Sequence, residues 1–271
     1  MNNIVFSLQD VHFSYLKRYP ALCGVSVEIR KGEKAAFIGA NGTGKSTLLQ
    51  ILDGLIFPDS GKAFAFGKEL NENTFNDGEF SLFFRSKVGF VFQNPEVQLF
   101  SPTVEEDIIF GPLQFGVSTQ EIKKRLEFLS ESFKIRELLK RPPHYLSIGE
   151  KRKIAIATVL AIDPEVLIMD EPTAGLDPQT ARQIIDIIVQ ANLEGRTIIT
   201  ATHDLHIVEE ISDTVYVLDR NKQITTCGSP EEILSDGELL KNNNLIHIHK
   251  HRHKDKIHIH GHCHISDHHR E

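Results

Sequence analysis

The eight residues from Gly39 to Ser46, Gly-Ala-Asn-Gly-Thr-Gly-Lys-Ser, have the types and the spacing needed to bind phosphate. They fit the phosphate-loop pattern, and they stand between an apolar run, Ala35 to Ile38, and a helical pattern that starts at Thr47. Glycines let the backbone wrap around phosphate oxygens, and the helix N-terminus adds partial positive charge. A glycine-rich turn that binds nothing is the alternative, and the flanking strand and helix argue against it.

Each residue of this loop has an expected role. Lys45 should reach the terminal phosphates, and the hydroxyl of Ser46 should bind Mg²⁺. The nucleotide-binding positions predicted in this stretch are Gly39, Asn41, Gly42, Gly44, Lys45, Ser46 and Thr47.

Polar residues that could take part in catalysis or binding also follow three other apolar runs. Asp170 and Glu171 follow the run at 166–169, Gln93 follows the run at 87–92, and His203 follows the run at 197–202. Adjacent carboxylates at the end of a buried strand are costly unless they manage cations or protons, so we expect Asp170 to bind Mg²⁺ and Glu171 to polarise the attacking water. Ligands of open α/β folds bind at the carboxyl ends of strands, which favours roles for Gln93 and His203. A solvated acidic turn, a polar strand cap and a structural histidine are the alternatives.

Apolar patterns predict the elements that position these residues. Ile4 to Leu8, Val25 to Ile29 and Ala63 to Phe66 alternate as half-buried strands, which favours an antiparallel edge beside a parallel core. Tyr15 comes just after the first strand, where it either joins the core or offers its face to a nucleobase. The alternation of strands and helices predicts the α/β class.

Helical spacing dominates from about residue 100 to residue 160. Ile122, Leu126 and Leu129 recur on one face, which predicts a mainly helical insertion. Ser147 precedes a helical run and has Glu150 three residues later, the pattern of a capping box. The same helix end could instead present N–H groups and a hydroxyl to an anion.

Composition excludes several classes of protein. No apolar run approaches the roughly 20 residues that span a bilayer, and the N-terminus lacks a signal-peptide layout, so we expect a soluble intracellular protein. The net charge is −7, and it is −9 without the segment from Ile246, which argues against nucleic acid as a partner. Three cysteines are too few and too scattered for a disulfide framework.

The last 31 residues are rich in histidine. Alternate residues of an extended segment share one face, so imidazoles here could converge on Ni²⁺, Co²⁺, Zn²⁺ or Cu²⁺. The candidate ligands are His247, His249, His251, His253, His258, His260, His262 and His264. Such a site should load poorly below about pH 6, where imidazole is protonated. A purification tag and a disordered tail without a role are the alternatives.

Taken in order, these motifs resemble those of the nucleotide-binding subunit of an ATP-binding cassette (ABC) transporter. The matching segments are the phosphate loop at 39–46, the glutamine loop at Gln93, the signature at 146–150, the strand with Asp-Glu at 166–171, the loop at 174–177 that ends in Asp177, and the histidine switch at His203. Tyr15 matches the aromatic residue that stacks on adenine. The resemblance covers roughly residues 3 to 240.

This resemblance implies a phosphate-loop core with a parallel sheet, an N-terminal antiparallel β subdomain and an inserted helical subdomain. It assigns residues 1–240 to the ATPase domain and leaves 241–271 as a flexible tail. It also implies that two subunits, identical or different, pair head to tail around ATP and Mg²⁺. Ser147 and Gly149 would then complete the partner's site, and Gln93 would join Ser46 and Asp170 at Mg²⁺.

The signature departs from the usual Leu-Ser-Gly-Gly-Gln, because Ile148 fills the first glycine position and Glu150 replaces glutamine. A side chain at Ile148 could hinder the approach of phosphate to the backbone unless its Cβ points away. We expect an effect on rate or affinity rather than loss of activity, and a milder effect from Glu150.

A narrower resemblance lies at 91–100 and 103–112, which are similar to ATPases of energy-coupling-factor importers, especially those for cobalt and nickel. That group implies a transmembrane coupling protein, a substrate-binding membrane component and a position at the cytoplasmic face of the membrane. The sequence therefore predicts an ATPase that powers import of Ni²⁺ or Co²⁺. The alternatives are a vitamin importer with an incidental tail, and a nucleotide-regulated metal-storage protein or metallochaperone.

Overall fold

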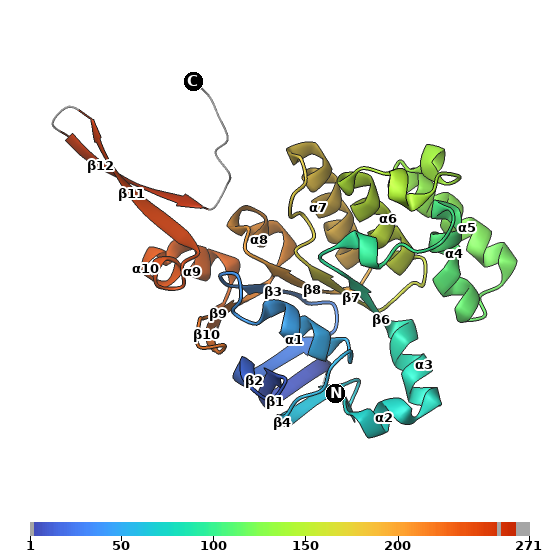
Figure 1. Cartoon of the computed structure of the whole chain (residues 1–271), viewed down its shortest axis with the longest axis horizontal. Coiled ribbons are helices and arrows are strands. Elements are labelled where there is room, and N and C mark those ends of the chain that lie inside the picture. The colour runs from blue at the N-terminus through green and yellow to red at the C-terminus, as the bar shows by residue number, and fades with distance from the viewer. Residues whose placement is uncertain (1–2, 254–255, 264–271) are drawn as a thin grey trace.

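The apolar runs expected to be buried strands lie side by side in one six-stranded sheet (Figure 1). In pairing order the strands are β10 (Ile224–Gly228), β9 (Thr214–Leu218), β3 (Lys34–Ile38), β8 (Thr197–Thr202), β7 (Val166–Asp170) and β6 (Val88–Val91). The pairings from β9 to β6 are parallel, and β10 is antiparallel to β9. The computed structural model describes residues 3–253 and 256–263, and side chains within residues 3–246.

Burial on both faces explains why these strands read as continuous apolar runs. Every residue of β7 and β8 is buried, including the threonines of β8. Parallel strands covered by helices on both sides have this composition. Because β3, β7 and β8 are neighbours and run in the same direction, their carboxyl ends meet at one edge of the sheet. That edge receives the residues predicted to do chemistry.

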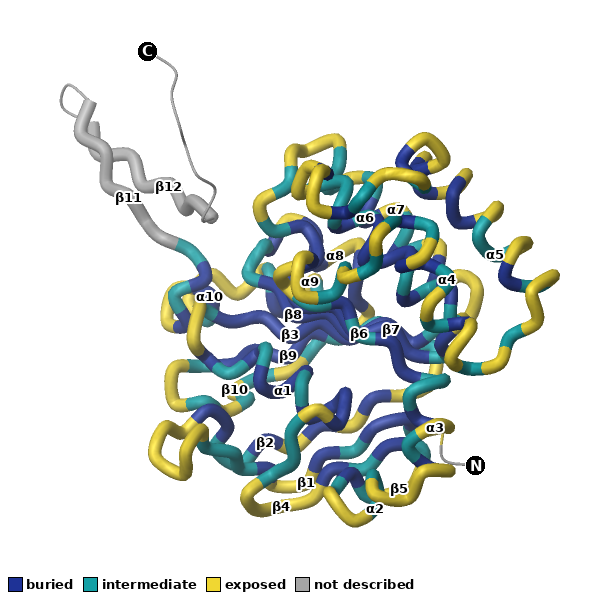
Figure 2. The backbone as a smooth tube through the Cα atoms, turned by 45° about the vertical axis from the view of Figure 1, so that its right-hand side comes forward, coloured by how far each residue is buried: buried dark blue, intermediate teal, exposed yellow. Residues whose placement is uncertain are grey.

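The N-terminal strands form a separate antiparallel sheet rather than an edge of the parallel one. Its pairing order is β2 (Tyr19–Arg30), β1 (Ile4–Tyr15), β4 (Ser60–Ala65) and β5 (Lys68–Glu69). The strands are longer than the alternation predicted, because β1 continues through register shifts to Tyr15, which therefore lies in the strand and not after it. A core that includes Phe6 and Leu8 of this sheet, Ile51 of helix α1 and Phe37 of β3 joins the two sheets (Figure 2).

Helices cover the remaining faces. Their bounds are α1 (Lys45–Leu52), α2 (Glu72–Asn76), α3 (Gly78–Lys87), α4 (Val104–Gln114), α5 (Thr119–Ser132), α6 (Ile148–Leu160), α7 (Pro178–Leu193), α8 (Leu205–Ile211), α9 (Pro230–Ser235) and α10 (Gly237–Asn242), with short 3-10 turns η1 (Pro95–Val97), η2 (Arg136–Leu138) and η3 (Pro143–Tyr145). A second core joins α4, α6 and α7 to β7 and includes Ile108, Ile154, Met169 and Ile188. Within the described residues, no helix has the length and apolarity needed to cross a bilayer.

The histidine-rich segment pairs with itself. Strand β11 (Ile246–His253) is antiparallel to β12 (Lys256–Cys263), with His247 opposite His262, His249 opposite His260 and His251 opposite His258. The side chains of both strands from His247 onward, and the whole of His264, lie outside the described part of the structure. The predicted metal site on this segment therefore stays a prediction.

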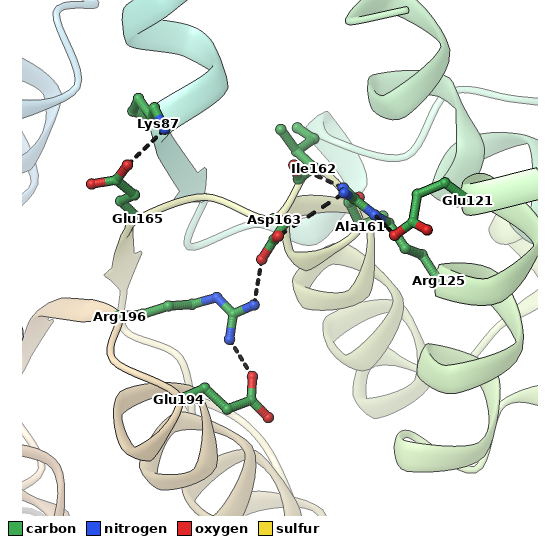
Figure 3. A network of polar contacts seen from close by, with 9 residues as sticks. All are labelled: Lys87, Glu121, Arg125, Ala161, Ile162, Asp163, Glu165, Glu194 and Arg196. Carbon is green, nitrogen blue, oxygen red and sulfur yellow. Dashed lines mark hydrogen bonds and ion pairs between the residues drawn. The ribbon is translucent and has the colours of Figure 1, made fainter. Parts of the chain in front are cut away.

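A polar network ties the helical insertion to the sheet (Figure 3). Arg125 of α5 donates to the carbonyl oxygens of Ala161 and Ile162, at 2.9 and 3.1 Å, just after the end of α6. In the loop that follows, Asp163 pairs with Arg196 at 2.6 Å, next to the start of β8. Helix ends leave carbonyls without partners, so Arg125 satisfies groups that would otherwise be left unpaired.

Arg125→Ala should lower the thermal midpoint of unfolding by about 2–6 °C, because hydrogen bonds from a charged donor contribute about 1–2 kcal/mol when partly buried. Arg136→Ala is the matched control, since Arg136 contacts only the exposed carboxylates of Glu127 and Glu131. Its midpoint should stay within about 1 °C of the parent. Equal shifts in calorimetry of the two variants would contradict the role of Arg125.

Candidate functional site

The loop between β3 and α1 adopts a shape that requires glycine at two positions. Gly44 has φ 105°, and a Cβ there would lie 2.2 Å from the carbonyl oxygen of Ala21. A Cβ on Gly39 would lie 2.6 Å from the carbonyl oxygen of Leu218. Both approaches are too close for any other residue, so the loop can lie against β2 and β9 only with these glycines. The loop then opens into the N-terminus of α1, an arrangement that binds phosphate.

Lys45 begins α1 and is almost fully buried. Its ammonium donates to the carbonyl of Gly39 at 2.8 Å and lies 3.9 Å from Oε1 of Glu171. Burial lowers the pKa of Lys45, and the charges of Glu171 and Asp170 oppose that effect. A cation held beside carboxylates at the mouth of the loop is suited to exchange them for phosphate oxygens.

Asp170 is the last residue of β7 and is 5% exposed. Burial raises its pKa, while a hydrogen bond from Ser46 acts in the opposite direction. Its Oδ1 atom is buried without a hydrogen-bond partner among the described residues. An orphaned carboxylate oxygen beside a hydroxyl fits Mg²⁺, which prefers oxygen ligands. These two residues would hold the ion, and Mg²⁺ would neutralise charge on the phosphates.

Glu171 sits in a strained turn directly after β7, with φ 48°. Its backbone N–H donates to Ala201 at 2.8 Å, and its Oε1 lies 2.7 Å from Nδ1 of His203. This hydrogen bond raises the pKa of His203. The hydroxyl of Thr202 and the amide of His203 donate to the other carboxylate oxygen, at 3.3 and 3.4 Å. The Glu171 carboxylate is therefore fixed by three groups from the end of β8.

Gln93 follows β6 and lines the same cavity as Lys45 and Glu171. Arg152 of α6 holds it in place from behind, donating to the carbonyl oxygens of Phe92 at 2.8 Å and Gln93 at 2.6 Å. Arg152 is 2% exposed, and burial lowers its pKa. Arg152 belongs to no motif of the sequence, because a basic residue on a helix after a capping box has the appearance of a surface group. The apolar residues around it, Ile154 to Ala157, were the only sign of burial.

Most of the predicted nucleotide-binding residues surround one cavity of about 440 Å³. Those that line it are Tyr15, Asn41, Gly42, Gly44, Lys45, Ser46, Thr47, Gln93 and Glu171. Tyr15 is 43% exposed, and its hydroxyl lies 3.1 Å from that of Thr47. An exposed ring held above the loop leaves an aromatic face for a base.

The signature residues lie elsewhere. Ser147, Gly149 and Asp177 line a second cavity of about 290 Å³ that contains none of the phosphate-loop residues. Ser147 and Glu150 form both halves of the predicted capping box, and Ile148 is 61% exposed. Asp177 caps α7, accepting from the amides of Gln179 and Thr180 at 3.0 Å each. A larger hollow of about 540 Å³ between α5, α6 and α7 contains none of the predicted site residues.

A phosphate loop, a buried Asp-Glu pair and a histidine at adjacent strand ends can bind a nucleoside triphosphate and activate water against it. The fold and this site define a phosphate-loop nucleotide-hydrolysing protein. One chain contains the loop and the water-activating groups together, while the signature faces a separate opening.

Comparison with known proteins identifies the family within the class of phosphate-loop nucleotide-hydrolysing proteins. A family model described as ABC transporter matches residues 22–174. The chain is 46% identical over 244 residues to the nickel import ATP-binding protein NikO of Rhodobacter capsulatus, which covers 89% of this chain and 95% of NikO. It is 40% identical over 241 residues to the energy-coupling factor transporter ATP-binding protein EcfA of Methanothermobacter thermautotrophicus, covering 89% of this chain and 76% of EcfA.

A solved structure agrees with these relatives. CbiO1 from Clostridium perfringens, described as part of the ABC transporter complex cbiONQ, matches with a TM-score of 0.76 and 36% identity over 90% of this chain and 95% of that chain. The chain belongs to the ABC transporter family of ATP-binding proteins. The predicted resemblance, fold class and ATPase activity coupled to transport are confirmed.

Glu171→Gln should keep ATP binding and lower kcat by about 10²–10⁴-fold, because the amide preserves the shape but cannot accept a proton from water. Turnover measured by phosphate release and affinity measured by calorimetry separate the two effects. Glu231→Gln, an exposed change on α9, is the control. Unchanged turnover in the Glu171 variant would remove this residue from the mechanism.

The raised pKa of His203 makes one part of the stability depend on pH. The protonated imidazole is favoured in the folded chain, so this contribution is fully present below the unfolded pKa of about 6.5 and is lost as pH rises through the folded value. The thermal midpoint of His203→Asn should therefore approach that of the parent as pH rises above about 6.5. A difference between the two proteins that is constant over this range would be inconsistent with a His203–Glu171 pair.

Proposed function

We propose that this chain is the ATP-hydrolysing subunit of a membrane importer for Ni²⁺ or Co²⁺. The observation that carries the proposal is the match to the nickel import protein NikO along nearly the full length of both chains. The histidine-rich segment supports a transition metal as the substrate, because imidazole is the side chain that suits Ni²⁺ and Co²⁺.

The contacts at the end of β7 support the catalytic roles that we propose. Glu171 accepts a proton from the attacking water, and His203 orients Glu171 and then the terminal phosphate. Lys45 leaves Glu171 and pairs with the phosphates, which frees the carboxylate at the moment of binding. Ser46, Asp170 and Gln93 hold Mg²⁺, and Tyr15 stacks on the base.

A second ATPase subunit, identical or different, completes each site. The support is the separation of the two cavities, since Ser147, Gly149 and Asp177 line a cavity that shares no lining residue with the cavity around the phosphate loop. A head-to-tail pair brings the N-terminus of α6 from one chain to the phosphates bound by the other. ATP then favours the closed pair only if it binds that state more tightly than the open one.

An apolar surface beside Gln93 suits a membrane coupling protein. Val97 and Phe100 are 65% and 67% exposed, and Phe100 packs edge-on against Phe110 of α4. Leu113, also on α4, is 52% exposed. We assign this surface to the coupling protein, which places the chain at the cytoplasmic face of the membrane beside a substrate-binding component. The acidic body argues against nucleic acid as a partner.

The histidine-rich hairpin holds the metal near the importer. Directly opposed residues of an antiparallel pair share a face, and the register places three histidine pairs in this way, beginning with His247 and His262. Imidazole must be neutral to bind, so loading falls below about pH 6.

Uptake of labelled Ni²⁺ and Co²⁺ by vesicles that carry this chain with its membrane partners tests the proposal. Uptake should require ATP and disappear with Glu171→Gln. Removal of residues 246–271 should lower uptake at low metal concentration and leave ATP hydrolysis unchanged. Import of a vitamin instead of either metal would favour the function shared with other energy-coupling-factor relatives. ATP-dependent metal release without any membrane partner would favour a metallochaperone.

A further inference from the structure

Lys222 is a charged residue of the nucleotide cavity that no motif contains. It belongs to the turn between β9 and β10, and it lines the cavity together with Tyr15 and the phosphate loop. Its ammonium donates to the carbonyl oxygen of Gly42, inside that loop. We propose that Lys222 binds the phosphate chain of the nucleotide, an assignment that rests on ATP binding at this site.

The backbone fixes Lys222 at this position. Its carbonyl oxygen accepts from the amide of Cys23 in β2 at 2.9 Å, and its own amide donates to Asp219 at 3.2 Å. The residue adopts φ 67°, a left-handed conformation that usually favours glycine. Although glycine would suit this backbone conformation, it has no side chain. Lysine at the same position places an ammonium group next to the phosphate loop.

The charged residues that line the cavity explain why Lys222 would bind phosphate. Three charged side chains line the cavity: Lys45, Glu171 and Lys222. Lys45 lies 3.9 Å from Glu171, so these two charges offset each other before nucleotide binds. Among the side chains that the structure describes, no carboxylate lies within 4 Å of the Lys222 ammonium, and Gly42 accepts from only one of its three N–H donors. The remaining donors and the unbalanced charge suit a polyphosphate.

A purely structural role is the competing explanation, in which Lys222 only props the loop through Gly42. The two roles differ in their dependence on the ligand. If Lys222 only supports the loop, its removal lowers the affinity for every nucleotide equally and lowers the stability of the free protein. A phosphate contact affects nucleotides in proportion to the phosphates they carry, and it leaves the stability of the free protein nearly unchanged.

The test measures calorimetric affinities of the full chain for ATP, ADP and AMP in EDTA, where ATP is not hydrolysed. Lys222→Gly removes the ammonium and suits φ 67°, so it should weaken ATP binding about tenfold, ADP binding less and AMP binding least. Lys222→Arg keeps the charge and should bind ATP within about threefold of the parent. Arg220→Gln removes the same charge from the same turn without lining the cavity, and should change nothing.

Two results would overturn the assignment. One is an unchanged ATP affinity in Lys222→Gly. The other is an equal loss for the three nucleotides with a lower thermal midpoint, which identifies a structural prop. Failure of metal uptake would contradict Ni²⁺ or Co²⁺ as the transported substrate. It would not affect the calorimetric test of Lys222, because nucleotide binding by the purified chain does not depend on what is transported.

Discussion

Buried charges at one edge of the parallel sheet constrain the rest of the structure. Lys45, Asp170, Glu171 and Arg152 are all less than 10% exposed and lie within each other's electrostatic influence. Burial disfavours the charged forms of Lys45, Asp170 and Arg152, so removing a single partner leaves an uncompensated charge. The glycines of the loop, the strained backbone at Glu171 and the threonines of β8 keep these groups at the required separations. Nucleotide binding can then exchange one set of charges for another without rebuilding the fold.

The sequence was most informative where several residues serve one ligand. The phosphate loop was predicted from its residue spacing and its flanking strand and helix, Asp170 from the cost of adjacent carboxylates at the end of a buried strand, and His203 from its position at a strand end. The antiparallel sheet was predicted only in part, since register shifts extend β1 beyond the alternating run to Tyr15. Helices α2 and α3 were not predicted at all. Their apolar residues are mainly phenylalanines, such as Phe75 and Phe84, that pack on one another rather than along a regular helical stripe.

Contacts between distant segments could not be predicted from residue types. Arg152 lies between two lysines in the sequence and Lys222 between an asparagine and a glutamine, and only the tertiary fold brings them to Gln93 and Gly42. The altered signature shows a related effect. Glu150 accepts from both the amide and the hydroxyl of Ser147, which lowers the pKa of Glu150 and keeps a negative charge at the start of α6. Glutamine in its place would supply the same cap without that charge, so the substitution alters how the helix end receives an anion.

Arg152 joins the two cavities of a single chain. Its side chain is bonded to the segment that carries Gln93, while its backbone belongs to the helix whose first turn carries Gly149. Gln98 adds a second link, donating to Ala155 at 2.8 Å and to Thr158 at 3.0 Å on the same helix. Because these hydrogen bonds join the segment of Gln93 to α6, a displacement of that segment would also displace the helix. In the head-to-tail pair proposed above, a subunit that tightens around its own ligand would also change the face that it offers its neighbour, so the two bound ligand molecules would influence each other without touching.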